Sequence, residues 1–440
     1  MARLTNTLLL LTLSTSGLLL AQIDPGPGRG PQGPGPARPL AGLNANELAW
    51  FNEGADRFRE VDSVSGTQPG APGSGLGPRF NGNSCSQCHA HPVMGGSSPI
   101  LNPQVELATA FGASNRVPAF IQQNGPVRVV RFVRNPDGSP DGGVHDLFTI
   151  TGRSDAPGCT IPQPDFDAAV RQNNAIFRIP TPVLGGGLLE AISEAAIMAN
   201  LAADAPQKQK LGIRGRENRN GNDGTITRFG WKAQNKSLLL FAGEAYNVEQ
   251  GVSNEIFPNE REEAPGCATN PTPEDHTHPD ENRVLSSISD LTGIMHFMKF
   301  SAPPPPSSPQ DPSVQRGADA FSQIGCALCH TPVLQSGNAG VAALRNKPVA
   351  LYSDLSLHNM GTALNDGINQ GRARGADWRT APLWGLGARL FFLHDGRTQD
   401  LAEAIRFHAS RGSEANQVVD NYNALSADAK QDLLNFLRSL

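Results

Sequence analysis

The pattern C-x-x-C-H occurs twice in this chain and restricts its possible folds more than any other feature. Two thiols one helical turn apart can add to the two vinyl groups of one haem, and the next histidine then lies beneath the iron as its proximal ligand. Chance would give such a pattern in about two chains per thousand of this composition. The sequence therefore predicts two covalently attached haem c groups, held by Cys85, Cys88 and His89 (CSQCH) and by Cys326, Cys329 and His330 (CALCH).

The cysteine pairs have two other interpretations, a zinc site and a redox-active disulfide. A zinc site would require both pairs to converge on one metal, and the histidines would then have no role. Haem attachment accounts for the cysteines and the histidines together, so we prefer it.

The first 21 residues have the features of a secretory signal peptide. Arg3 precedes apolar stretches at residues 8–13 and 18–20, and Ala21 supplies a small residue for cleavage. The polar residues 14–16 interrupt the apolar run, which is too short and too polar to span a bilayer comfortably. We therefore expect export to the periplasm and a mature chain that does not insert into the membrane.

Glycine and proline are abundant, with 47 and 36 residues respectively, and the formal net charge is −5. So much glycine and proline limits long regular elements. We therefore expect a mainly α-helical, loop-rich protein whose core is organised by a bound apolar group. The weak negative charge argues against nucleic acid as a partner.

Two proline-rich segments divide the chain into expected domains. Residues 22–42 form a Pro/Gly-rich spacer, and residues 301–312 (SAPPPPSSPQDP) have the composition of a linker. We expect an N-terminal cytochrome c-like haem domain with large insertions at 43–300 and a C-terminal one at 313–440. Helical spacing of apolar residues over 43–58 predicts a helix, with Asn44 as its N-cap.

The two expected domains repeat each other in sequence. NEGADRF (52–58) precedes the first C-x-x-C-H motif, and QRGADAF (315–321) precedes the second. Later, FRIPTPVLGGGLLEAI (177–192) is similar to WRTAPLWGLG (378–387). Chance similarity of Gly/Pro-rich loops could explain the second pair alone, but not both pairs in the same order. The pattern indicates duplication of a small helical haem module.

Two cysteines, Cys159 and Cys267, lie outside the motifs. In an oxidising compartment, an even number of cysteines outside the haem motifs favours a disulfide between them. Two buried free thiols are the alternative. Eight histidines also lie outside the motifs. We expect His276 and His278, in an acidic loop, to face solvent, and His91 to be too close to the first motif to reach the other face of that haem. His145 and His296 have no distinctive context. His358, His394 and His408, in the second domain, are candidates for function.

Six segments carry a resemblance to the dihaem oxidoreductase family, also described as thiol oxidoreductase-like. The chain is more distantly similar to bacterial dihaem cytochrome c peroxidases and to the dihaem enzyme that matures methylamine dehydrogenase. The segments extend the resemblance over about residues 43–440: GLGPRFNGNSCSQCHAHP (75–92), TGRSDAPGC (151–159), RFGWKAQNKSLLLF (228–241), YSDLSLHNMG (352–361), RTAPLWGLG (379–387) and FLHDGRTQDLAEAIRFH (392–408).

The resemblance implies an N-terminal haem with an open coordination position for peroxide and a C-terminal haem that delivers an electron. It implies that Trp231 lies between the haems and that Glu249 handles protons beside the open iron. An ordinary core tryptophan and a surface glutamate are the alternatives, and Glu244 is a second candidate for the proton-handling group. The relatives' glutamine about ten residues before that glutamate, and the removable histidine ligand of some peroxidases, have no counterpart here.

The sixth ligand of the C-terminal haem has two candidates. His408 lies where the relatives have an axial methionine or tyrosine, and Met360 (LHNMG) could ligate in the manner of cytochrome c. We favour His408; the alternative is that His408 caps the end of its helix.

We therefore expect a periplasmic dihaem c-type oxidoreductase with peroxidase-like activity. Its partners would be a small oxidant such as peroxide and a small periplasmic electron-transfer protein. The resemblance also allows a structural Ca²⁺. An oxidase of thiols, sulfur compounds or a protein side chain, and a plain electron-transfer cytochrome, are the other functions that the sequence leaves open.

Overall fold

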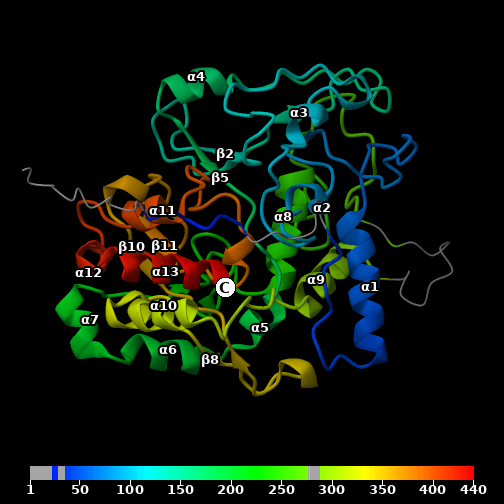
Figure 1. The fold of residues 1–440 in the computed structure, drawn as a ribbon. Helices are drawn as coiled ribbons and strands as arrows, with labels where there is room; N and C mark the ends of the chain where they lie inside the picture. Colours follow the sequence, from blue (N-terminus) through cyan, green and yellow to red (C-terminus); the bar gives the residue numbers. More distant parts are fainter. Residues whose placement is uncertain (1–21, 28–34, 276, 278–287) are drawn as a thin grey trace, which may run out of the picture.

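The computed structural model describes residues 22–27, 35–275, 277 and 288–440. The expected signal peptide, His276 and His278 lie outside these residues. Helices form the frame of the molecule (Figure 1). In the described part of the chain they are α1 (Ala45–Arg59), α2 (Cys85–Cys88), α3 (Gln104–Leu107), α4 (Phe166–Arg171), α5 (Gly186–Ala191), α6 (Glu194–Ala202), α7 (Ala205–Leu211), α8 (Leu238–Gln250), α9 (Asp290–Phe300), α10 (Pro312–Gln323), α11 (Leu401–Phe407), α12 (Asn416–Ala424) and α13 (Ala427–Ser439).

The strands are short and form small antiparallel sheets. The pairs are β1–β4, β6–β7, β8–β9 and β10–β11, and one three-stranded sheet has the order β3-β2-β5. Their bounds are β1 (Arg79–Phe80), β2 (Val129–Phe132), β3 (Val144–His145), β4 (Phe148–Thr149), β5 (Ala175–Arg178), β6 (Asn218–Arg219), β7 (Ile226–Thr227), β8 (Leu334–Gln335), β9 (Pro348–Val349), β10 (Leu357–Asn359) and β11 (Asp377–Arg379).

The first helix begins as the sequence predicts. The Asn44 side chain accepts a 3.0 Å hydrogen bond from the backbone N–H of Glu47, and the Glu47 carboxylate accepts one of 2.9 Å from the N–H of Asn44. This reciprocal pair satisfies two donors that the first turn would otherwise leave unpaired. The predicted helix over 43–58 is confirmed, with Asn44 as its N-cap.

The same helix crossing occurs twice. Helix α1 packs against α9, and α10 packs against α13 (Figure 1). A Cβ on Gly54 would lie 2.2 Å from the carbonyl oxygen of Gly293, and one on Gly317 would lie 2.1 Å from that of Asp432. The glycine shared by NEGADRF and QRGADAF therefore allows close helix contact in both halves. This equivalence supports the duplication inferred from the sequence.

The second repeated segment also has one structure in both halves. Gly185 and Gly385 have φ values of 75° and 73°. The N–H of Gly185 donates to the carbonyl of Ser301 at the end of α9, and the N–H of Gly385 donates to that of Leu440 at the end of α13. Each glycine turn therefore joins the end of the last helix in its own half.

The first half contains a region of short strands that the expectation of a mainly α-helical protein did not predict. The β3-β2-β5 sheet lies with α3 and α4 in the upper part of the molecule in Figure 1. A disulfide joins Cys159 to Cys267 there, with a Cα–Cα distance of 4.7 Å, which confirms the predicted pairing. The insertion is therefore built mainly from short strands and loops, with only the short helices α3 and α4.

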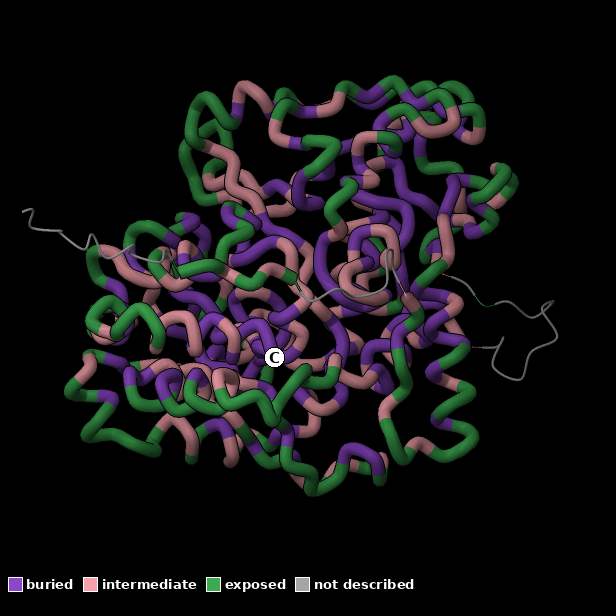
Figure 2. The backbone as a smooth tube through the Cα atoms, viewed as in Figure 1, coloured by how far each residue is buried: buried purple, intermediate pink, exposed green. Residues whose placement is uncertain are grey.

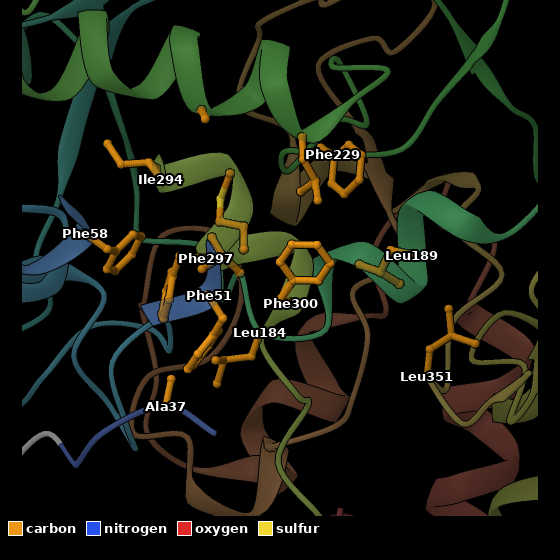
Figure 3. Close-up of a cluster of buried hydrophobic side chains, with 14 of the residues drawn as sticks. Ala37, Phe51, Phe58, Leu184, Leu189, Phe229, Ile294, Phe297, Phe300 and Leu351 are labelled. Atoms are coloured by element: carbon orange, nitrogen blue, oxygen red, sulfur yellow. The ribbon is translucent and has the colours of Figure 1, made fainter. Parts of the chain in front are cut away.

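The core around the first helix crossing is aromatic (Figure 3). The ring centroids of Phe58 and Phe297 lie 4.4 Å apart, and those of Phe51 and Phe297 lie 5.8 Å apart. In the second half, Phe321 and Phe436 occupy the corresponding crossing at 5.3 Å. Figure 2 shows buried backbone through the centre of the molecule and exposed backbone on the outer helices and loops. Every helix in the described ranges is too short or too polar to cross a membrane.

Candidate active site

Each C-x-x-C-H motif borders a cavity, and the two cavities lie in different halves of the repeat. We call them the N-terminal and C-terminal cavities. Residues lining the N-terminal cavity include Cys85, Cys88, His89, Arg131, Arg178, Trp231, Glu244 and Glu249. Residues lining the C-terminal cavity include Cys326, Cys329, His330, His358, Met360, Trp378, Arg379, Arg389, His394 and His408, together with Trp231.

The histidine of each motif is held in the same way. Nδ1 of His89 donates to the carbonyl oxygen of Gly96 at 3.2 Å, and Nδ1 of His330 donates to that of Tyr352 at 3.0 Å. Burial lowers the pKa of both imidazoles to about 4, so the rings are neutral near pH 7. A neutral ring anchored through Nδ1 leaves its Nε2 lone pair available for a metal.

None of the four motif cysteines forms a disulfide. Nε2 of Gln250 donates to Sγ of Cys85 at 3.2 Å. In each cavity, two thiols and one oriented imidazole line an otherwise largely apolar space. This donor set fits a haem bound through two thioethers and one histidine.

The C-terminal cavity holds a second histidine with the same anchoring. Nδ1 of His408 donates to the carbonyl oxygen of Ala404 at 2.7 Å, which leaves Nε2 available. Burial is the main cause of the lowered pKa of His330, and the His408 ring lowers this pKa further. The two imidazole rings are therefore close enough to interact electrostatically. Met360 also lines this cavity.

The other two candidate histidines of this half have different surroundings. His358 is hydrogen bonded at 2.9 Å to Asp354 through Nε2 and at 2.9 Å to Glu414 through Nδ1, so both ring nitrogens are occupied. His394 stacks on Trp378 with centroids 3.8 Å apart and an interplanar angle of 19°. Neither histidine resembles His408, whose Nδ1 is hydrogen bonded and whose Nε2 is available.

Two carboxylates line the N-terminal cavity, whereas the C-terminal cavity has His408 and one carboxylate, Glu414. Among the described residues that line it, His89 is the only histidine. Helix α8 contributes both Glu244 and Glu249 to the wall. Burial raises the pKa of Glu249 to about 7, and the Arg131 guanidinium opposes that shift. Glu244 accepts a hydrogen bond from the side chain of Asn235.

Trp231 lines both cavities. It is hydrogen bonded to both halves, because its indole N–H donates to the carbonyl of Ile179 and its own carbonyl accepts from the N–H of Arg379. Of the other histidines outside the motifs, His91 donates to the carbonyl of Ala388 at 2.7 Å, and His145 contacts Asp141 at 2.8 Å. His296 stacks beside Trp50 at 5.0 Å.

Four arginines in the cavity walls, two of them buried and two partly buried, were not predicted from the sequence. These are Arg131, Arg178, Arg379 and Arg389. A signal existed for two of them, because Arg178 and Arg379 occupy the same place in FRIPTP and WRTAP. Nothing in the sequence distinguished Arg131 or Arg389 from a surface charge.

Among solved structures, the chain is similar to hydrazine synthase of Kuenenia stuttgartiensis, with 16% identity over 36% of this chain and a TM-score of 0.24. That match spans 58% of the hydrazine synthase chain. It is similar to a MauG-like protein associated with microbial copper homeostasis, with 17% identity over 57% of this chain and 89% of that chain, and a TM-score of 0.29. A variant of the diheme peroxidase BthA from Burkholderia thailandensis matches at 14% identity over 92% of this chain and 86% of that chain, with a TM-score of 0.37.

These structural similarities are low, and no curated protein matches the sequence. The family described as "Di-haem oxidoreductase, putative peroxidase" matches residues 131–440, which is more than half of the chain. The matched region includes Trp231, Glu249 and the second C-x-x-C-H motif, and it begins after the first motif. The chain belongs to this family, and it is a di-haem oxidoreductase.

Proposed function

We propose that this protein is a periplasmic dihaem c-type cytochrome that reduces peroxide in its N-terminal cavity. A small periplasmic electron-transfer protein would supply electrons through the C-terminal haem. The observation that carries the proposal is the difference between the cavities. A second anchored histidine, His408, faces the C-terminal one, whereas the carboxylates Glu244 and Glu249 line the N-terminal one.

The residues that would hold the haems are those of the two motifs. Cys85 and Cys88 would form the thioethers of the first haem and Cys326 and Cys329 those of the second. His89 and His330 would be the proximal ligands, with His408 as the sixth ligand in the C-terminal cavity. When bound, the haems supply the electron transfer and the activation of peroxide. Among the described residues, no group of three or more His, Cys, Asp or Glu is placed to hold a metal ion. The structural Ca²⁺ that the resemblance allows therefore has no site assigned to it and stays a prediction.

The protein's part in the reaction is to move protons. Reduction of peroxide to two waters takes up two electrons and two protons. One proton must also pass from the inner peroxide oxygen to the leaving oxygen. We assign this transfer to Glu249, because a pKa of about 7 lets its carboxyl group both accept and donate near neutral pH.

Electrons would cross from one cavity to the other beside Trp231. Its ring lines both cavities, so it shortens the gap that an electron must cross. A conjugated side chain between two redox centres is the arrangement that such a relay requires.

The test is a spin-state measurement on the purified holoprotein, followed by steady-state assays. Mass spectrometry after denaturation should first show two haem masses added to residues 22–440. We then expect one high-spin and one low-spin ferric haem, and turnover with peroxide. Two low-spin haems without turnover would indicate an electron carrier, and turnover with thiols but not peroxide would indicate a sulfur-compound oxidase.

A further inference from the structure

Each cavity wall contains two arginines, one buried (Arg178 or Arg379) and one partly buried (Arg131 or Arg389). Arg131 on β2 and Arg178 at the end of β5 line the N-terminal cavity. Arg379 at the end of β11 and Arg389 line the C-terminal cavity. None of the four is assigned a step in the proposed peroxide chemistry, although Arg131 lowers the pKa of Glu249. Guanidinium groups withdrawn from water require negative partners.

The N-terminal pair projects from one sheet face and is incompletely hydrogen bonded. Val129 pairs with Arg178 across the sheet, and Arg131 lies two residues further along the same strand. Side chains at this spacing share a face. In the described structure, Nε of Arg131 and Nε of Arg178 are both buried and have no hydrogen-bond partner. A buried donor left unpaired costs about 1–3 kcal/mol.

Other nitrogens of these two guanidinium groups do form hydrogen bonds. Nη1 of Arg131 donates to the carbonyl of Gly142 at 2.7 Å. Nη1 and Nη2 of Arg178 donate to Gln370 at 2.6 Å and to Asp366 at 2.8 Å. Asp366 is also paired with Lys232 at 3.2 Å, so one carboxylate serves two cations. The carboxylates Glu244 and Glu249 line the same cavity, but among the described residues neither forms an ion pair with Arg131 or Arg178.

The C-terminal pair lacks carboxylate partners. Arg379 donates through Nε to the carbonyl of Gly230 at 2.9 Å and through Nη1 to that of Thr380 at 3.5 Å. Among the described residues, neither Arg379 nor Arg389 forms an ion pair. Burial lowers the pKa of both to about 10, and the charge of Arg389 lowers that of Arg379 further. Both groups are still charged at neutral pH.

We infer that the four arginines bind the propionates of the two haems, Arg131 and Arg178 in the N-terminal cavity and Arg379 and Arg389 in the C-terminal cavity. The inference rests on the proposed haem attachment. A haem carries two carboxylates, and each cavity offers two guanidinium groups. Arginine suits this task because its planar fork matches carboxylate geometry.

The repeat provides an independent argument. Arg178 is the last residue of β5 and Arg379 the last residue of β11, and each precedes the glycine turn of its own half. Duplicated modules would hold equivalent cofactors through equivalent contacts. The same arginine at the same strand end in both cavities is what a shared carboxylate-binding role predicts.

The test uses Arg131→Gln and Arg389→Gln, because neither side chain forms an ion pair whose loss would leave a carboxylate unpaired in the described structure. Each haem's reduction potential is measured by spectroelectrochemical titration of the holoprotein, with the haems distinguished by their spin states. Thioether bonds keep the haems attached, so haem content should not change. Removing a positive charge should favour the oxidised haem about tenfold at fixed applied potential. Arg131→Gln should act on the N-terminal haem, and Arg389→Gln on the C-terminal haem.

Two controls separate charge from general damage. Arg131→Lys and Arg389→Lys keep the charge and should leave the potentials near those of the unaltered protein. Arg228→Gln removes a buried arginine that bonds to backbone carbonyls and lines neither cavity, so it should change neither potential. Unchanged potentials in both Gln variants, or equal shifts in the Arg228 variant, would overturn the inference. Shifted potentials in a protein that does not turn over peroxide would overturn only the proposed activity.

Discussion

The indole Nε1 of Trp231 donates a 2.9 Å hydrogen bond to the carbonyl oxygen of Ile179, directly after Arg178 in the first half of the repeat. The carbonyl oxygen of Trp231 accepts a 3.0 Å bond from the N–H of Arg379 in the second half. Both halves of the repeat therefore fix this residue, and its ring is held where it lines both cavities.

Replacing this tryptophan should slow electron transfer between the haems. We expect Trp231→Phe to keep both haem spectra, because Trp231 ligates neither iron, and to lower the rate of transfer because the indole is lost. Rapid-mixing spectroscopy after reduction of the C-terminal haem measures that rate. Trp50→Phe is the matched control, since Trp50 stacks beside His296 and lines neither cavity. Equal rates in the Trp231 variant and the unaltered protein would remove the relay role.

A second prediction concerns the sixth ligand of the C-terminal haem. His408 is anchored through Nδ1 in the same way as the proximal His330, and Met360 lines the same cavity without such an anchor. His408→Ala should convert the low-spin haem to high spin, and Met360→Ala should leave it low spin. Electron paramagnetic resonance distinguishes these states. A methionine-to-iron charge-transfer band that persists in His408→Ala and is lost in Met360→Ala would assign the ligand to Met360.

The sequence was informative where local chemistry determines structure. Cap chemistry at Asn44 predicted the start of α1. The repeat of NEGADRF as QRGADAF predicted duplicated modules, and the structure places their shared glycine at a helix crossing in each half. Cysteine parity predicted the Cys159–Cys267 disulfide. Each of these features depends on residues close in sequence or on a simple count, so no knowledge of distant contacts was needed.

The β3-β2-β5 sheet and the paired arginines depend on contacts between distant segments. Val129 pairs with Arg178 only after the intervening loops have folded, and two-residue to four-residue strands leave little alternation to detect. A single arginine such as Arg131 reads as a surface charge until its burial is known. The position of Glu249 in a cavity wall depends on how α8 is oriented, which packing decides.

The disulfide should contribute to stability. It closes a loop of 108 residues between the inserted segments of the first half. In the chain-entropy description such a closure adds roughly 4 kcal/mol or less. The double variant Cys159→Ala/Cys267→Ala should therefore unfold at lower denaturant concentration while keeping both haems, measured by equilibrium unfolding followed by circular dichroism. An unchanged denaturant midpoint would mean that closing this loop does not add to the free energy of unfolding.

The last prediction is that Glu249 is the proton-transfer group of the N-terminal cavity. Burial raises the pKa of its carboxyl to about 7, and the Arg131 guanidinium keeps the shift from being larger. Only the carboxylate form can accept the peroxide proton, so kcat/KM for peroxide should rise as pH increases through about 7. Glu249→Gln should retain both haems, lose the pH dependence and lose about 10²–10⁴ in rate, the usual cost of removing a positioned acid or base. Steady-state assays over a pH series measure all three outcomes.

Glu244→Gln is the matched control, because Glu244 lines the same cavity from the same helix. Its carboxylate already accepts a hydrogen bond from Asn235, so it is less free to exchange a proton with a bound peroxide. We expect this variant to keep most of the activity and the rise through pH 7. Loss in Glu244→Gln together with normal turnover in Glu249→Gln would transfer the role to Glu244. Normal turnover in both variants would contradict carboxylate-assisted peroxide cleavage in this cavity.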